Sequence, residues 1–433
     1  MNYDECREWL ENRRKNMGSV PGLDEVNRLL DAYKRPDNDF PIIHIAGTNG
    51  KGSVGYLLEQ TLFKNKIKVG RFLSPAVLDE REIILVNGKI VPKTVWAGHL
   101  SQIIETVEKN DLKATAFEIE FVLSLLIFKE KECEIIILEC GMGGKLDATN
   151  AVKNSLVDII TSISIDHTDF LGDTLKKISL HKFGIIKDTS KNVLLAAQTL
   201  EVENYFDEYV SENVKNTRVL KSDKGKVKAK TEKKNKRFYQ LISYKEFENI
   251  RLSLLGLNQI DNAVCVLDAI SILRDEGYDI KDRALRNAFE NANWPSRFEI
   301  IEKDRTFILD GAHNFDAARV LFDNLNLYFT NRNLIYIMGM YKDKAYEEVV
   351  RNYVKKAKAV ITVSPKDSKR ALEAFELGKC VKEYNENVTA SDSYFEALEI
   401  ARLLSDKKDV ILIFGSLSFM GDFRRLILSE NNG

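Results

Sequence analysis

One glycine-rich segment near the N-terminus combines the residue types that a protein needs to hold phosphate groups. It reads Gly47-Thr-Asn-Gly-Lys-Gly-Ser53 and contains a single lysine and a serine hydroxyl. Glycines let backbone N–H groups approach an anion, Lys51 supplies a full positive charge, and Ser53 could ligate Mg²⁺. The pattern therefore predicts binding of a nucleoside triphosphate, with ATP as the first candidate.

The flanking sequence places this segment between a strand and a helix. The preceding run 41–46 is apolar and rich in isoleucine, and apolar residues at helical spacing follow from Val54. A strand, a loop and a helix N-terminus in this order form a phosphate cradle, to which the helix dipole adds positive potential. The common motif G-x-x-x-x-G-K-[ST] would place a hydroxyl directly after Lys51, where this chain has Gly52. An ordinary βα loop is therefore the alternative interpretation.

Two further strand ends have side chains that could hold a metal ion. Glu139 ends the apolar run 135–139, and His167 follows a strand that we expect over 157–164. A carboxylate at the end of a buried strand is costly to leave unpaired, and a neutral imidazole can ligate a metal. Taken singly, Glu139 could cap a helix and His167 could be a structural histidine. Together they predict a shared Mg²⁺ site at the edge of the sheet where parallel strands end.

Composition excludes several classes of function. The 64 basic and 65 acidic residues give a net charge of −1, which offers no electrostatic argument for nucleic acid or an anionic membrane. The basic run 224–236 has no interleaved aromatic residues, so we interpret it as a solvated hairpin rather than a nucleic-acid patch. Five dispersed cysteines without a C-x-x-C pair indicate reduced thiols in a cytoplasmic protein. We expect neither a secretory signal nor a membrane span.

The elements that must position these residues alternate along the chain. Strands are expected at 41–46, 68–73, 134–139, 157–164 and 191–195, with helices at 53–65, 93–109, 116–130 and 174–186. This alternation predicts an α/β fold whose mostly parallel sheet is covered on both faces. Between about 211 and 256 the sequence changes to lysine-rich alternating stretches, which predict a small antiparallel β subdomain.

A second, smaller α/β unit is expected towards the C-terminus. Residues 257–291 are helical in pattern, and Pro295 indicates a linker. Strands at 305–309, 334–338, 358–363 and 410–414 then alternate with helices in a Rossmann-like order, without a G-x-G-x-x-G motif. The predicted domains are 1–292 for ATP binding, a linker at 293–298, and a C-terminal domain at 299–433.

The ordered motifs resemble those of the folylpolyglutamate synthase/dihydrofolate synthase branch of the Mur ligase superfamily. The matching landmarks run from residue 47 to about residue 425 and include the following: Gly47–Ser53, Ser74-Pro75, Glu80-Arg81, Phe117-Glu118, Glu139–Asn150, Asp166-His167, Lys182, Gln259, Asn262, Trp294-Pro295, Arg297, Asp310–Asn314 and Gly415–Leu417. Glycine loops alone would be unspecific, but the ordered set, with its Gly-Gly-x-Leu-Asp-Ala-Thr-Asn run, covers nearly the whole chain.

The resemblance implies ATP-dependent amide ligation. The γ-phosphate would pass to a carboxylate of a folate, and the amino group of L-glutamate would attack the acyl phosphate. Tetrahydrofolate polyglutamylation is the implied activity, with conversion of dihydropteroate to dihydrofolate as a second one. Positioning and charge neutralisation dominate such a reaction. A monomer without nucleic-acid or membrane partners is implied as well.

The resemblance also assigns roles to residues. Phosphate contacts would come from Asn49, Gly50, Lys51, Gly52 and Ser53. Further ATP contacts would come from Asn262, Arg297 and Asp310. The Mg²⁺ ligands would be Ser53 or Ser74, with Glu139 and His167. Phe117, Glu118 and Asp147 would hold the pterin-bearing substrate, and His313 and Ser416 would contact glutamate. The catalytic set implied is Lys51, Lys182, Arg297 and His313.

Lys182 has a special role in this resemblance, because the family's lysine at this place is carbamylated by CO₂. The product is an anion that helps to organise Mg²⁺, and its formation requires a partly desolvated lysine with a lowered pKa. The family pattern Glu-Lys-Ala-Gly is His181-Lys182-Phe183-Gly184 here, so an unmodified helical lysine is the alternative.

Other departures from the family pattern leave the substrate open. The usual Ser-Pro-His reads Ser74-Pro75-Ala76, Gly-Gly-Arg ends in Lys145, and Trp-Pro-Gly ends in Ser296. These changes bear on pterin selectivity and on the dihydropteroate activity. Two alternatives remain: a Mur-type ligase that joins an amino acid to another carboxylate, and a non-catalytic ATP-binding regulator.

Overall fold

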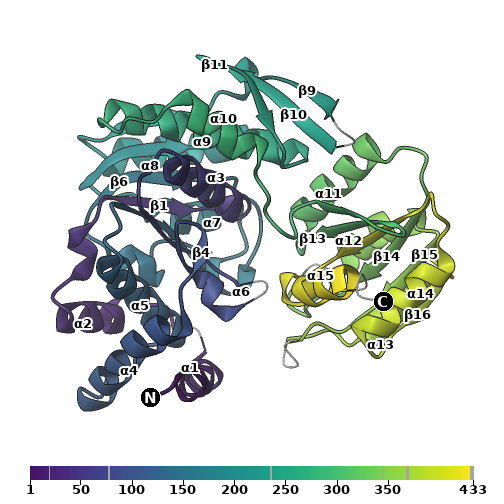
Figure 1. The fold of residues 1–433 in the computed structure, drawn as a ribbon, viewed down its shortest axis with the longest axis horizontal. Helices are drawn as coiled ribbons and strands as arrows, with labels where there is room; N and C mark the ends of the chain where they lie inside the picture. The colour runs from purple at the N-terminus through teal and green to yellow at the C-terminus, as the bar shows by residue number, and fades with distance from the viewer. Residues whose placement is uncertain (19, 77–78, 235–236, 345, 367–369, 430–433) are drawn as a thin grey trace. The chain divides into compact units, whose positions relative to one another are not determined.

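The computed structural model describes the chain except for residues 19, 77–78, 235–236, 345, 367–369 and 430–433 (Figure 1). The chain forms two compact units. The first comprises Met1–Glu232, Gln240–Leu252 and Gln259–Ala292, and the second comprises Lys233–Tyr239, Ser253–Asn258 and Asn293–Gly433. Among the described residues, no helix combines the length and the apolar character that crossing a bilayer requires.

The first unit is built on an eight-stranded sheet. Its strands are β1 (Ile42–Ala46), β2 (Val69–Phe72), β3 (Ile84–Val86), β4 (Lys89–Ile90), β5 (Ile135–Glu139), β6 (Ser155–Ile160), β7 (Ser190–Leu195) and β8 (Arg218–Lys221). They lie in the order β4-β3-β2-β5-β1-β6-β7-β8, and only β3 and β4 run antiparallel to their neighbours. The central strand β1 is buried along its length because both of its faces are covered, and four of its five residues are apolar.

Helices of this unit cover both faces of the sheet. Their bounds are α1 (Tyr3–Met17), α2 (Asp24–Ala32), α3 (Lys51–Lys64), α4 (Lys93–Lys109), α5 (Ala116–Glu130), α6 (Thr168–Leu171), α7 (Leu175–Phe183), α8 (Leu200–Asn213), α9 (Leu257–Asp275) and α10 (Asp282–Glu290). Helix α5 is apolar almost all round because it lies between β2 and the helices α1, α2 and α4. Its start is fixed by a capping box in which Thr115 and Glu118 bond each other's backbone N–H groups.

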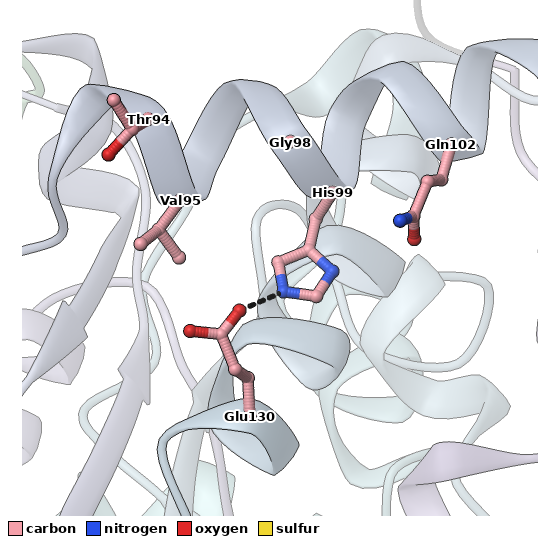
Figure 2. Close-up of a pocket in the computed structure, with 6 residues that line it drawn as sticks. All are labelled: Thr94, Val95, Gly98, His99, Gln102 and Glu130. Atoms are coloured by element: carbon pink, nitrogen blue, oxygen red, sulfur yellow. Dashed lines mark hydrogen bonds and ion pairs between the residues drawn. The ribbon is translucent and has the colours of Figure 1, made fainter.

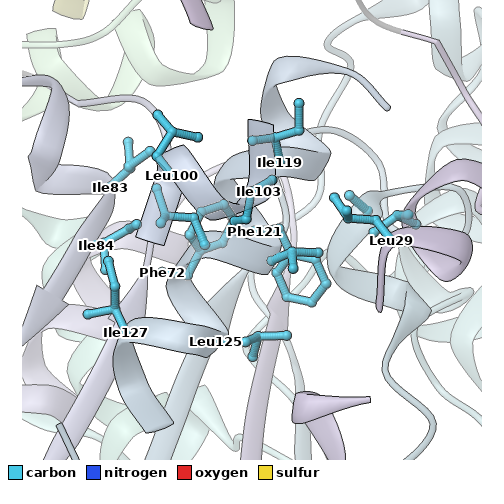
Figure 3. Close-up of a cluster of buried hydrophobic side chains, with 14 of the residues drawn as sticks. Leu29, Phe72, Ile83, Ile84, Leu100, Ile103, Ile119, Phe121, Leu125 and Ile127 are labelled. Carbon is cyan, nitrogen blue, oxygen red and sulfur yellow. The ribbon is translucent and has the colours of Figure 1, made fainter. Parts of the chain in front are cut away.

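One core cluster of the first unit joins α4 and α5 to the sheet. It contains Leu100 and Ile103 of α4, Phe121 and Leu125 of α5 and Phe72 of β2, and all five are fully buried (Figure 3). This cluster packs α5 on β2 and also includes Ile136 and Leu138 of β5, the strand that ends at the predicted metal and substrate region. Helix α3 packs on β1, β2 and β5 and is covered in turn by α10.

The second unit contains a six-stranded sheet in the order β12-β13-β17-β14-β15-β16. Its strands are β12 (Glu299–Glu302), β13 (Thr306–Asp310), β14 (Leu334–Met338), β15 (Ala359–Thr362), β16 (Val388–Ala390) and β17 (Val410–Phe414). Only β12 is antiparallel. The helices are α11 (Phe315–Tyr328), α12 (Tyr346–Tyr353), α13 (Ala374–Lys382), α14 (Tyr394–Leu404) and α15 (Met420–Ser429). A separate apolar cluster holds this sheet and its helices together.

The predicted α/β class is confirmed, and three expectations about elements are corrected. Strand β6 ends at Ile160 rather than at 164, because the carbonyl of Ser162 accepts hydrogen bonds from the glycine-rich loop. Strand β8 joins the large parallel sheet instead of the antiparallel subdomain. That small sheet consists of β9 (Lys228–Lys234), β10 (Arg237–Tyr244) and β11 (Phe247–Leu252), so the antiparallel subdomain begins at Lys228 rather than at about 211, and most of the basic run 224–236 belongs to β9. The last two residues of this run lie outside the described part of the chain.

Candidate active site

Two lysines converge on one backbone carbonyl of the glycine-rich loop. The Nζ of Lys51 donates to the Gly47 carbonyl at 3.0 Å and to the Thr48 carbonyl at 3.3 Å. The Nζ of Lys182, which comes from α7, donates to the same Gly47 carbonyl at 2.9 Å. The two Nζ atoms thus share one oxygen beside the N-terminus of α3, where Lys51 adds its positive charge to that of the helix dipole. This arrangement suits an anion such as a phosphate chain.

The loop takes backbone conformations that favour glycine. Gly47 has a φ of 150° and Gly50 a φ of 93°. A Cβ at Gly50 would collide with the side-chain amide of Asn262, so the loop passes directly against α9. Asn262 donates to Gln259 at 3.1 Å, and Gln259 donates to the hydroxyl of Ser53 at 3.2 Å. The structure thus brings Asn262, predicted from the sequence, next to Gly50 and Ser53.

The segment after β6 holds the loop from its other side. The hydroxyl of Thr48 donates to the Ser164 carbonyl at 3.0 Å and accepts from the Ser164 N–H at 3.1 Å. The N–H groups of Thr48 and Asn49 donate to the carbonyl of Ser162. Neither serine was predicted to have a role in the site. Their signal was the run of small hydroxyl residues Thr161-Ser162-Ile163-Ser164, which directly follows a strand.

The predicted metal ligands lie on strands that flank the loop. The strand order β2-β5-β1-β6 places Ser74 after β2, Glu139 at the end of β5 and Ser53 in the first turn after β1. His167 follows β6, with its N–H donating to Asp166 at 2.9 Å. Among the described residues no group of three His, Cys, Asp or Glu side chains is placed to hold a metal. A buried carboxylate, an imidazole and a hydroxyl fit a Mg²⁺ ion that takes its remaining ligands from phosphate and water.

Lys182 is buried and chemically unusual. Burial first and then the charge of Lys51 lower the pKa of Lys182 from 10.5 to about 7. Asp166, Cys140 and Asp147 act in the opposite direction but do not restore the usual value. A substantial fraction of this amine is therefore neutral near neutral pH, which is the form that can react with an electrophile.

Two of the three predicted pterin-side residues, Phe117 and Asp147, contact the turn that follows β5. A Cβ on Gly141 would lie 2.8 Å from the ring of Phe117, so this ring packs directly against the turn. The carboxylate of Asp147 accepts from the N–H of Met142 at 2.8 Å and from the hydroxyl of Thr149 at 2.7 Å. Burial raises the pKa of Asp147. Glu118 lies in the same region, but its carboxylate accepts from the N–H and hydroxyl of Thr115 and caps α5.

In the second unit, Arg297 and Asp310 lie together at the end of β13. The Asp310 carboxylate accepts from the N–H groups of Phe298 and Ala312, both at 2.8 Å. Burial raises the pKa of Asp310, although the nearby Arg297 charge opposes the shift. A Cβ on Gly311 would lie 2.9 Å from an Arg297 nitrogen, which places the guanidinium over this turn. Ser296 and Phe298, on either side of Arg297, have φ values of 60° and 49°, and such strain is typical of functional sites.

The predicted glutamate-side residues lie on the adjoining strand ends. His313 follows β13, and its Nδ1 lies 2.8 Å from the Gly311 carbonyl. Ser416 follows β17, which pairs with β13, and its hydroxyl caps the short helical turn Leu417–Phe419. The second unit thus presents its polar residues at the carboxyl ends of two neighbouring parallel strands, where α/β proteins bind ligands.

One surface pocket of the first unit contains none of these residues. It has a volume of about 300 Å³ and is lined by Thr94, Val95, Gly98, His99, Gln102 and Glu130, in which His99 and Glu130 are 2.6 Å apart (Figure 2). The candidate site residues are therefore those at the strand ends of the first unit and those at the strand ends of the second.

Known proteins match the chain over nearly all of its length. Residues 45–270 match the Mur ligase middle domain, and residues 296–417 match the Mur ligase glutamate ligase domain. A Bacillus subtilis dihydrofolate synthase/folylpolyglutamate synthase is 31% identical over 98% of this chain and 98% of its own length. The Escherichia coli dihydrofolate synthase/folylpolyglutamate synthase is 27% identical over 90% of this chain and 88% of its own length.

Solved structures agree with these matches. A Mycobacterium tuberculosis folylpolyglutamate synthase complexed with ADP and AMPPCP superposes with a TM-score of 0.84 at 25% identity, and the match covers 99% of this chain and all of that one. The Thermotoga maritima folylpolyglutamate synthase has a TM-score of 0.81 at 29% identity, with 99% and 98% of the chains covered. This chain belongs to the Mur ligase superfamily, in its folylpolyglutamate synthase/dihydrofolate synthase branch.

Proposed function

We propose that this protein is an ATP-dependent ligase that adds L-glutamate to a folate through an acyl-phosphate intermediate. The observation that carries the proposal is the convergence of Lys51 and the buried Lys182 on the Gly47 carbonyl. Relatives support it, because an Escherichia coli protein of 25% identity and TM-score 0.83 was solved with DHPP and ADP. Dihydropteroate is the second acceptor that we propose to test.

The phosphate chain of ATP is proposed to lie over the glycine-rich loop. Lys51 would exchange its two loop carbonyls for phosphate oxygens, and the N–H groups of the first turn of α3 would donate to the same oxygens. Asn262 adjoins Gly50 and supports the loop at its α9 side. Positioning of the γ-phosphate against the acceptor carboxylate supplies most of the catalysis in such transfers.

Glu139 and His167, with Ser53 or Ser74, are proposed to hold Mg²⁺. When bound, the ion would neutralise charge that develops on the phosphates. We further propose that Lys182 is carbamylated: the ammonium group loses one proton, the neutral amine attacks the carbon of CO₂, and the nitrogen then releases a second proton, so that a cation becomes an anion. Carbon-13 bicarbonate added to the folded protein should give a carbamate NMR signal that is absent from Lys182→Met.

In the second unit, Arg297 and Asp310 are proposed to contact ATP, and His313 and Ser416 to contact glutamate. Phe117 and Asp147 are proposed to hold the pterin. Glu118 is proposed to contribute indirectly, because its carboxylate caps the start of α5, where Phe117 lies. We also propose the domain boundaries 1–292, 293–298 and 299–433. A monomeric state and a cytoplasmic location complete the proposal, and all five cysteines are free thiols, which suits a reducing compartment.

An acceptor panel tests the function. Purified protein with ATP, Mg²⁺ and L-glutamate is offered tetrahydrofolate, dihydropteroate or a nucleotide-linked peptide precursor, and phosphate release and the new amide are measured. We expect release with a folate and a loss of about 10²-fold or more for Lys51→Ala, as when one preorganised charged donor is removed. Release with the peptide precursor alone would indicate another Mur-type ligase. Nucleotide binding without release for any acceptor would indicate a regulator.

A further inference from the structure

A fully buried ion pair lies beneath the glycine-rich loop. Arg71 of β2 and Glu59 of α3 each have 0% exposed side chains, and the Nη1 of Arg71 lies 3.0 Å from the Oε2 of Glu59. Removing two charges from water is expensive, and well-packed apolar residues often serve stability as well as a buried pair does. Stability alone therefore does not explain why Arg71 and Glu59 are charged, and the contacts of the pair indicate another role.

One face of α3 is shaped around the Arg71 guanidinium. Gly52, Gly55 and Glu59 follow one another at spacings of three and four residues, which places them on the same side of the helix. A Cβ on Gly55 would lie 3.3 Å from the Nε of Arg71, so the glycine leaves room for the guanidinium. Glycine inside a helix lowers helix stability, and this packing gives a physical reason for it.

The guanidinium links the ion pair to the loop itself. Its Nη2 donates to the carbonyl of Gly52 at 3.3 Å, and Gly52 lies between Lys51 and Ser53 in the first turn of α3. The second carboxylate oxygen of Glu59 accepts from the N–H of Gly88 at 2.7 Å. The carboxylate is thus anchored at both oxygens and orients the guanidinium towards the turn.

We propose that Arg71 is a positioning residue for nucleotide binding. It fixes the first turn of α3, whose free N–H groups face the phosphates, and Glu59 holds Arg71 in the required orientation. The pair acts through Gly52 and does not touch ATP. This inference rests on the proposed assignment of the glycine-rich loop to the phosphate chain.

A charge-free double variant separates positioning from stability. Glu59→Leu with Arg71→Met replaces both side chains by apolar ones of similar size and leaves no unpaired charge in the core. The midpoint of thermal unfolding should therefore stay close to that of the wild type. The Kd for a non-hydrolysable ATP analogue should rise about tenfold or more, the effect of losing one hydrogen bond from a charged donor. The KM for the folate acceptor should not change.

Two further variants keep the test decisive. Arg71→Lys retains the charge but lacks the planar fork that reaches both partners, so it should fold and weaken nucleotide binding in part. Arg35→Met with Asp37→Leu removes another ion pair, in which Asp37 is buried, Arg35 is 11% exposed and the two side chains are 2.8 Å apart, and should leave nucleotide binding unchanged.

Wild-type nucleotide affinity in both the double variant and Arg71→Lys would overturn the inference. Lys51→Ala distinguishes this failure from failure of the proposed function. If Lys51→Ala loses nucleotide binding while the Arg71 variants keep it, only the positioning role is wrong. If Lys51→Ala also keeps it, the loop assignment itself fails.

Discussion

At the scale of single residues, the informative feature is how the fold places Lys182. A lysine on an exposed helix face would keep its usual pKa, but α7 turns this side chain inward to the Gly47 carbonyl, where Lys51 already lies. Burial and a like charge both disfavour the ammonium form. The same placement that makes the amine reactive therefore costs folding stability at low pH.

This cost gives a pH-dependent prediction. Because the pKa of Lys182 is about 7 in the folded protein and 10.5 when unshifted, the unfolded chain binds more protons between these values. The free energy of unfolding contributed by this residue must then rise as pH increases from 7 towards 10.5. Lys182→Met should accordingly be more stable than the wild type at pH 6.5, with an advantage that shrinks by pH 9.5. Urea unfolding in CO₂-free buffer measures both proteins.

A constant difference between the two proteins across this pH range would contradict the lowered pKa. Lys187→Met serves as a control, because burial also lowers the pKa of Lys187. The Nζ of Lys187 donates to the Asn150 carbonyl at 3.0 Å rather than to the glycine-rich loop. That lysine has no place in the proposed site. Ligase activity should therefore fall for Lys182→Met and not for Lys187→Met.

At the scale of elements, the turn after β5 fixes where the pterin-side residues lie. Gly141 and Phe117 are distant in sequence, yet the turn packs against the first residues of α5 with no space between them. A glycine is therefore needed at position 141 to leave room for the Phe117 ring, and not because of the backbone conformation there.

A matched pair of glycine substitutions tests the turn. Gly141→Ala should push the Phe117 ring away, since the new Cβ would lie 2.8 Å from it, and raise the KM for the folate acceptor several-fold without changing nucleotide affinity. Gly98→Ala adds the same methyl group inside α4, where nothing lies within 4 Å. That variant should stabilise the protein by about 0.5–1 kcal/mol and leave the KM for the folate acceptor and the Kd for the nucleotide unchanged. Equal kinetic effects from the two substitutions would contradict the proposed role of the turn.

Elements with strong periodicity were predictable from the sequence, and elements that depend on distant partners were not. The expected helices 93–109 and 116–130 coincide with α4 and α5, because both bury several apolar residues along their length, and α5 also begins at a capping box. Helix α8 was missed, since only Val202 and Phe206 are buried in it. The end of β6 was misplaced because residues beyond Ile160 bond to the glycine-rich loop, a contact that no local pattern encodes.

The same limit applies to the site. Ordered motifs singled out Lys51, Glu139 and Lys182, but not the Arg71–Glu59 pair. A lone arginine in a short apolar strand and a glutamate in a helix give no sequence signal that they meet. Only the packing of α3 on β2 reveals their contact.

At the scale of the whole molecule, the chain has separate hydrophobic cores in its two compact units. One cluster packs α4 and α5 on the first sheet, and another packs α11 and α12 on the second. Because each unit buries apolar surface of its own, each has its own source of cooperativity, and a single two-state transition is not expected.

Two identical substitutions, one in each core, test this independence. Leu123 and Leu412 are both fully buried, the first in α5 and the second in β17. Replacing either with alanine should cost about 2–5 kcal/mol, the range for a buried leucine. In native-state hydrogen exchange, Leu123→Ala should speed exchange only in peptides of the first unit, and Leu412→Ala only in those of the second. If either substitution accelerates exchange equally in peptides of both units, the two units unfold together in one cooperative transition.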